Sequence, residues 1–165
     1  MTTSYQVARL GKTFAVLAVM TQCGCFNRST FSCPPEAAQF FIGSPGEQGA
    51  RLGAYPLKVQ LDLLLCGNTH HHPPAISLNA VFAKHGAAAV PLVRNALGRL
   101  RQDDIEVVTL LDVLHQMQLE KRYDVANDSA LMAIVRHAVE RMGNQAWKDL
   151  AQADLTAIIE DSLRK

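Results

Sequence analysis

The stretch from residue 86 to residue 119 reads GAAAVPLVRNALGRLRQDDIEVVTLLDVLHQMQL. Apolar residues recur three or four positions apart in both of its halves, which predicts one buried face on each of two helices. These residues are Val90, Val93, Leu97 and Leu100, then Val107, Leu110, Leu111, Leu114 and Met117. Pro91 is tolerated in a first helical turn, and Asp103 with Glu106 suits a helix start. The stretch therefore predicts two antiparallel helices joined by a short turn.

The two expected helices resemble one unit of the HEAT-type helical repeat. Pro91 falls in the first helix and Asp103-Asp104 in the turn, as in that family. The resemblance implies a scaffold of stacked hairpins that binds other proteins. The flanking pairs, 54–85 and 128–165, have similar length but lack the proline, so a simple helical bundle is the alternative.

Helical spacing continues on both sides of this stretch. One helix is expected from Pro56 to Cys66, ended by Gly67-Asn68, and the next stops at Gly86. Two more are expected downstream, one ended by Gly143 and the last beginning near Gln145. Their apolar positions are Leu131, Ile134, Val135, Ala138 and Met142, then Trp147, Leu150, Ala151, Leu155, Ile158 and Ile159. The sequence thus predicts an all-α domain of antiparallel helical hairpins over residues 54–165.

The first 24 residues are typical of a secretory signal. Arg9 and Lys12 precede the apolar run TFAVLAVM at 13–20, which is too short to span a bilayer. The following TQCGC resembles the end of a bacterial lipoprotein signal. That resemblance implies lipid attachment at Cys25 or Cys23 and a place in the bacterial cell envelope. Cleavage by an ordinary signal peptidase, or a cytoplasmic protein with an apolar first helix, is the alternative.

Residues 25–53 are rich in glycine and proline, which break regular structure. They are expected to form an irregular tether or a packed loop, with room for one helical turn at 36–42. The pair Phe40-Phe41 favours packing, because exposing both rings is costly.

Cysteine spacing gives one candidate disulfide. If Cys25 carries lipid and the signal is removed, Cys33 and Cys66 remain as a pair. Their bond would close a loop of 33 residues and stabilise the fold by roughly 3–4 kcal/mol. The alternative is that Cys66 is a small buried hydrophobe.

The run His70-His71-His72 is a candidate metal site. Imidazole binds zinc and other transition metals, and His85 or Cys66 could supply a further ligand towards the three or four that zinc requires. The alternatives are a solvated loop before Pro73-Pro74 and a loop that a partner recognises. No cofactor other than such a metal is expected.

The net charge and the absence of known motifs argue against several classes of function. The chain has 16 Lys and Arg against 15 Asp and Glu, whereas nucleic-acid binding usually requires a basic excess. It has no nucleophile elbow, P-loop or dinucleotide fingerprint. We expect His115 and His137 to lie at the boundary of the core. Arg122, Tyr123 and Trp147 are candidate partner-binding residues, of types enriched at interfaces.

The sequence therefore predicts a non-enzymatic helical protein of the cell envelope that binds a partner protein. Metal binding through the His70–His72 loop, and an enzyme built from scattered side chains, are the alternatives. A lipid anchor would add the membrane as a second partner. The oligomeric state is left open.

Overall fold

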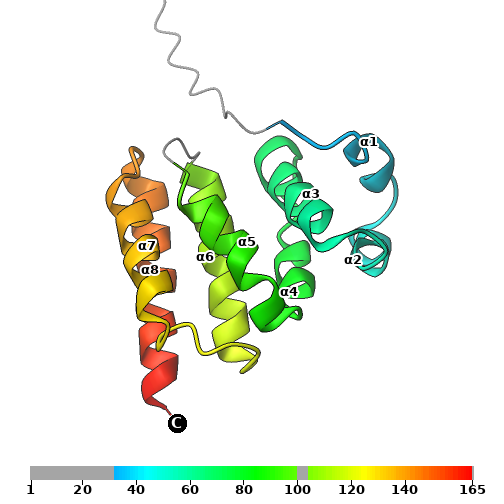
Figure 1. Ribbon diagram of the computed structural model, residues 1–165. Helices are drawn as coiled ribbons and strands as arrows, with labels where there is room; N and C mark the ends of the chain where they lie inside the picture. Colours follow the sequence, from blue (N-terminus) through cyan, green and yellow to red (C-terminus); the bar gives the residue numbers. More distant parts are fainter. Residues whose placement is uncertain (1–31, 100–103, 165) are drawn as a thin grey trace, which may run out of the picture.

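The computed structural model describes residues 32–99 and 104–164, and over these residues it is all helical (Figure 1). The predicted fold class is confirmed, and no strand occurs in the described ranges. The elements are α1 (Ala37–Phe40), α2 (Pro45–Leu52), α3 (Leu57–His70), α4 (Ser77–Ala83), the 3-10 turn η1 (Gly86–Ala88), α5 (Val90–Leu97), α6 (Asp104–Leu119), α7 (Ser129–Glu140) and α8 (Gln145–Leu163).

The helices stack as hairpins in two layers. Helices α2, α4, α6 and α8 each pack against the next member of that series, while α1 packs on α3 and α5 on α7. Packing on the helix two places along the chain is what stacked helical hairpins give. The right-to-left succession of hairpins is visible in Figure 1.

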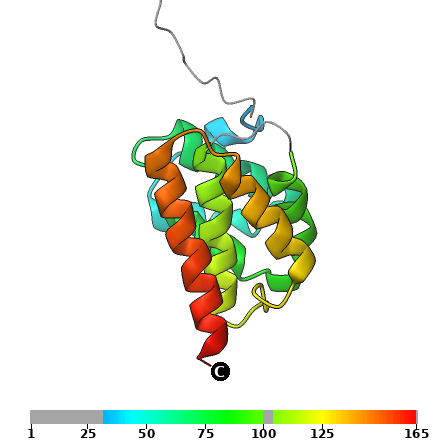
Figure 2. The ribbon, with the colours of Figure 1, turned by 90° about the vertical axis from the view of Figure 1, so that its left-hand side faces the viewer.

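Helices α6 and α8 run parallel. Asp104 begins α6, and its carboxylate accepts hydrogen bonds from the backbone N–H groups of Gly143 (3.3 Å) and Asn144 (2.7 Å), just before α8. Eleven residues along α6, His115 Nε2 lies 3.4 Å from Asp161 Oδ2, near the end of α8. Both helices therefore end on one side of the molecule. We call it the lower end, and the opposite side, where the described chain begins, the upper end (Figures 1 and 2).

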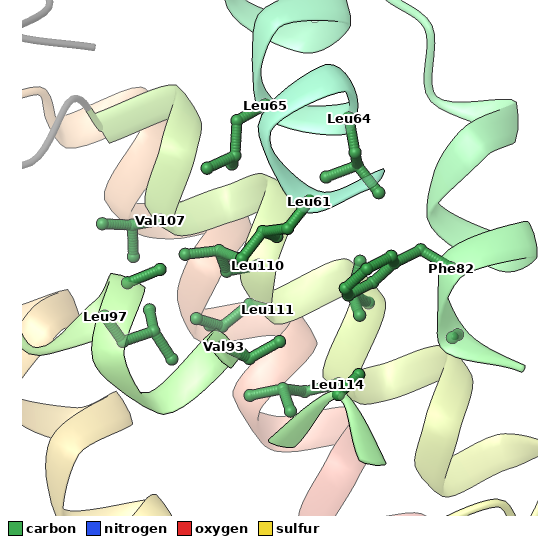
Figure 3. Close-up of a cluster of buried hydrophobic side chains, with 14 of the residues drawn as sticks. Leu61, Leu64, Leu65, Phe82, Val93, Leu97, Val107, Leu110, Leu111 and Leu114 are labelled. Atoms are coloured by element: carbon green, nitrogen blue, oxygen red, sulfur yellow. The ribbon is translucent and has the colours of Figure 1, made fainter. Parts of the chain in front are cut away.

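Helix α6 lies in the middle of the stack and packs against α3, α4, α5, α7 and α8. Leu110, Leu111 and Leu114 of α6 are fully buried, and they meet leucines of α3, Phe82 of α4 and apolar residues of α5 (Figure 3). The labelled members of this core are Leu61, Leu64, Leu65, Phe82, Val93, Leu97, Val107, Leu110, Leu111 and Leu114. One contiguous apolar core thus joins the hairpins.

The helical turn expected at 36–42 is confirmed as α1, whereas the irregular structure expected around it is wrong at 45–52, where α2 forms. Ser44 caps α2 because its side chain accepts from the Glu47 N–H, while the Glu47 carboxylate accepts from the Ser44 N–H at 2.7 Å. Pro45 at the first helical position fits this start. Gly43, at φ +99°, makes the turn between the two helices.

The expected end of α3 at Gly67-Asn68 is also wrong, because the helix continues to His70. Gly67 is a contact point rather than a stop: a Cβ atom there would lie 2.8 Å from both the Phe41 ring and the Ala75 Cβ. Asn68 is buried and satisfied, since its Nδ2 donates to Leu64 O and Asn79 Oδ1, both at 3.0 Å. Tertiary packing therefore overrides two residues that favour helix ends.

The remaining helix boundaries are close to those expected. Gly86 follows α4 with φ +50°, and Pro91 lies in the first turn of α5. Helix α5 is shorter than expected, because η1 precedes it and it ends at Leu97. Asp128 caps α7 through the Leu131 N–H. The expected capping role of Asp103 lies outside the described residues.

We predict that Gly67→Ala destabilises the protein by about 1–3 kcal/mol, the usual cost of overpacking. The added methyl group would displace the Phe41 ring, and this cost exceeds the gain in helix propensity of about 1 kcal/mol. Urea denaturation measures the change. Gly46→Ala in α2 is the matched control, because its Cβ would meet nothing within 4 Å. Equal or higher stability of Gly67→Ala would contradict the close contact with Phe41.

Candidate functional site

A disulfide fixes the upper end of the molecule. Cys33 and Cys66 are bonded, with their Cα atoms 5.1 Å apart and 33 residues between them in sequence. Cys66 is fully buried in α3, whereas Cys33 is partly exposed. The bond ties the first described residues to the last turn of α3. The candidate lipidation residues Cys23 and Cys25 lie outside the described residues.

The three consecutive histidines take different positions. His70 is the exposed last residue of α3, so the helix and not a loop carries it. His71 stacks on Phe41, with ring centroids 3.9 Å apart, and His72 is exposed. Phe41, next to α1, therefore packs against the histidine run.

The structure does not bring His85 to this run. His85 Nε2 lies 2.8 Å from Gln60 Oε1, and Gln60 precedes His70 by ten residues on α3, or about 15 Å along a helix. Cys66 is used by the disulfide. Within the described ranges, no three His, Cys, Asp or Glu residues are grouped so that they could hold a metal ion.

Exposed apolar and basic side chains surround the histidines. Ile42 and Ile76 are 66% and 68% exposed. The residues that precede them, Phe41 and Ala75, both lie against Gly67, so the two isoleucines are on the same part of the surface. The Arg51 guanidinium donates to the carbonyls of Phe40 (2.8 Å) and Ile42. We call this group the upper-end surface: Ile42, Arg51, His70, His71, His72 and Ile76.

Tyr123 packs partly buried against the core, and its hydroxyl donates to Asp128 Oδ2 at 2.7 Å. This hydrogen bond raises the pKa of Tyr123. The backbone N–H of Leu131, followed by the Tyr123 hydroxyl, holds the pKa of Asp128 below its usual value, and Arg94 adds an ion pair at 2.7 Å. Tyr123 thus anchors the start of α7.

The three candidate partner-binding residues do not form one site. Tyr123 and Arg122 follow α6 at the lower end, while Trp147 lies in the first turn of α8 and packs partly buried on the core at the upper end. Arg122 is exposed and faces Glu120 at 3.4 Å.

A second group of exposed apolar residues lies at the lower end, where α6 and α8 end. Leu119 ends α6 and Leu163 ends α8, and they are 56% and 80% exposed. Ile159 is one helical turn before Leu163 and 38% exposed. Because α6 and α8 are parallel and end together, these side chains share the lower end. We call these three residues the lower-end patch. Arg122, at the same end of the molecule, lies against Gly86, which follows α4.

Sequence reasoning missed a polar chain that crosses α3, α4, α6 and α8. The Asn79 amide accepts from Asn68 Nδ2 (3.0 Å) and donates to Asp112 Oδ2 (2.6 Å). One turn further along α6, His115 lies 3.8 Å from Asp154 and 3.4 Å from Asp161. The signal in the sequence was the spacing of Asp112 with His115 and of Asp154 with Asp161, which repeats by helical turns. His137, by contrast, is exposed near Glu140.

Asp154 is the residue of this polar network whose negative charge is poorly stabilised. Burial, and secondly the carboxylate of Asp112, raise the pKa of Asp154, and His115 opposes this only in part. The ionised form of Asp154 is therefore disfavoured between α6 and α8. The arrangement serves helix packing, since its groups already bond to one another.

None of the described helices is long and apolar enough to cross a membrane. Comparisons with protein-family models, with curated proteins and with solved structures give no match. A function for this chain must therefore be argued from its two exposed surfaces and its disulfide.

We predict that breaking the disulfide lowers the free energy of unfolding by about 3–4 kcal/mol, the cost of releasing a loop of this length. The test compares oxidised and reduced protein by urea denaturation in a Cys23→Ser/Cys25→Ser background. The control is the same background with Cys33→Ala/Cys66→Ala, whose urea denaturation midpoint should not change when reductant is added. If reduction does not change the urea denaturation midpoint of the protein that retains Cys33 and Cys66, the result argues against the bond.

We predict that Asp154→Asn raises the melting temperature at pH 7, on the order of 2 °C for a domain of this size. A carboxyl whose pKa is raised on folding favours the folded state only while protonated. The gain should thus vanish below the ordinary pKa of 3.8 and grow as the pH rises above it. Asp161→Asn is the matched control, because Asp161 faces both His115 and Arg164. A gain that is independent of pH would refute this assignment.

Proposed function

We propose that the protein is a non-enzymatic helical protein of the cell envelope that binds a partner protein through its lower-end patch. The observation that carries this proposal is the exposure of Leu119 and Leu163 where α6 and α8 end together. Exposed apolar patches of this kind are typical of protein-interaction sites.

The disulfide supports a location of the protein in the cell envelope. Disulfides persist in oxidising compartments such as the bacterial periplasm and are rare in the cytosol. Cys33 and Cys66 are bonded, and the lipoprotein-like segment at 21–25 precedes them. An export signal followed by a disulfide is a consistent combination, and lipid on Cys25 or Cys23 would hold the domain at a membrane.

The stacked hairpins also suit a binding protein. Helical-repeat proteins use their extended surfaces to bind partners. The outward face of α8 carries mostly polar and small residues, such as Gln152 and Thr156, which fits the polar cap that such stacks require. The lower-end patch interrupts this polar covering.

Metal binding has less support. The four histidine candidates are divided between two places about 15 Å apart, and His71 is engaged by Phe41. An enzyme has less support too, because Asp112, His115, Asp154 and Asp161 bond mainly among themselves and their helices.

Photo-crosslinking in intact cells tests the proposal. A photoreactive residue in place of Leu163 should give one discrete adduct with the partner, and the same residue in place of Gln152 on the polar face of α8 should not. Leu119→Asp should weaken the Leu163 adduct about tenfold. The unfolding free energy should change by less than about 0.5 kcal/mol, because Leu119 is exposed. Equal crosslinking at both positions, or none at Leu163, would refute the patch.

A further inference from the structure

The upper-end surface lies where the chain enters the fold. Cys33 is bonded to Cys66, one turn before His70. Cys25 precedes Cys33 by eight residues, which span at most about 29 Å when fully extended. A lipid on Cys25, as in the proposed function, would therefore keep His70, His71 and His72 close to the bilayer.

The residues of this surface are those that membrane interfaces accept. Ile42 and Ile76 are the most exposed large apolar side chains of the described chain outside α8, and Pro73 and Pro74 are exposed between them in sequence. Arg51 and the histidines supply polar groups that interact with lipid headgroups.

The charge of the surface depends on its histidines. No Asp or Glu occurs in residues 63–99, so α4 brings none. The charged residues on α2 and α3 are Arg51, Lys58, Glu47 and Asp62, and Glu36 precedes α1. Helix α6, which packs against α3, has Asp104 and Glu106 in its first turn. Glu47 is bonded to Ser44, and Asp62 pairs with Lys58 at 2.6 Å. With neutral histidines these residues give no basic excess, and three protonated imidazoles would add three positive charges.

We propose that the upper-end surface docks on an anionic lipid bilayer and does so more tightly when His70, His71 and His72 are protonated. Imidazoles as a class change charge between about pH 5 and 8. Anionic lipids attract basic side chains near the surface, by about fivefold in affinity for each charge. The apolar contacts of Ile42 and Ile76 act at any pH. The docked orientation turns the lower-end patch away from the membrane.

Vesicle sedimentation tests the proposal with the full chain carrying Cys23→Ser/Cys25→Ser, so that no lipid is attached. The vesicles are phosphatidylcholine with about 30% phosphatidylglycerol, or phosphatidylcholine alone. Between about pH 7.5 and 5.5, the partition coefficient on the anionic vesicles should rise by about 10- to 100-fold. His70→Gln/His71→Gln/His72→Gln should abolish this rise. The matched control His85→Gln/His137→Gln should keep it.

The apolar contribution has its own variant. Ile42→Ser/Ile76→Ser should lower binding several-fold at both pH values, and the comparison within one background removes any contribution of residues 1–31. The proposal is overturned if binding does not rise at low pH, if the histidine variant rises equally, or if neutral vesicles give the same rise. A photoreactive residue in place of Ile76 in intact cells gives one more test. The proposal is also overturned if this residue crosslinks to a protein and to no lipid. Loss of the Leu163 adduct alone would refute only the partner patch, and loss of vesicle binding alone only this inference.

Discussion

Helix α6 must be covered on several sides at once, because its buried residues are not confined to one stripe. Its apolar residues between Val107 and Met117 are almost all buried, and so are Glu106, Thr109 and Gln118. Five other helices supply the cover. At about 1.5–3 kcal/mol for each large apolar side chain, this burial is the main favourable contribution that the hairpins share.

The covering of α6 decides where the two exposed surfaces lie. Helix α8 lies parallel to α6 through the contacts of Asp104 and His115, so Leu119 and Leu163 end together. On the other side, α3 and α4 pack on α6, and Asn68, Asn79 and Asp112 fix their register by hydrogen bonds. The last turn of α3 then meets the disulfide and Phe41. One surface thus lies beside the start of the fold and the other at the far end.

Local signals predicted the later helices well. The apolar stripes of α6, α7 and α8 are long and periodic, and residues such as Asp128 cap them through bonds within one turn. The cysteine count gave the Cys33–Cys66 bond as one of two alternatives, and the structure contains it. The end of α3 could not be predicted, because Gly67 reads as a helix stop until Phe41 and Ala75 are known to touch it. The contact of His115 with Asp161 joins residues 46 positions apart, which no local pattern reveals.

We propose that the disulfide-bonded helical stack is held at the cell envelope near its upper end. The most direct measurement is the intact mass of the native protein from separated envelope and cytosolic fractions, with and without reduction. We expect an envelope protein that begins at Cys25 or Cys23, carries lipid, and gains two hydrogens on reduction as the Cys33–Cys66 bond opens. An unprocessed cytosolic protein whose mass reduction leaves unchanged would contradict it.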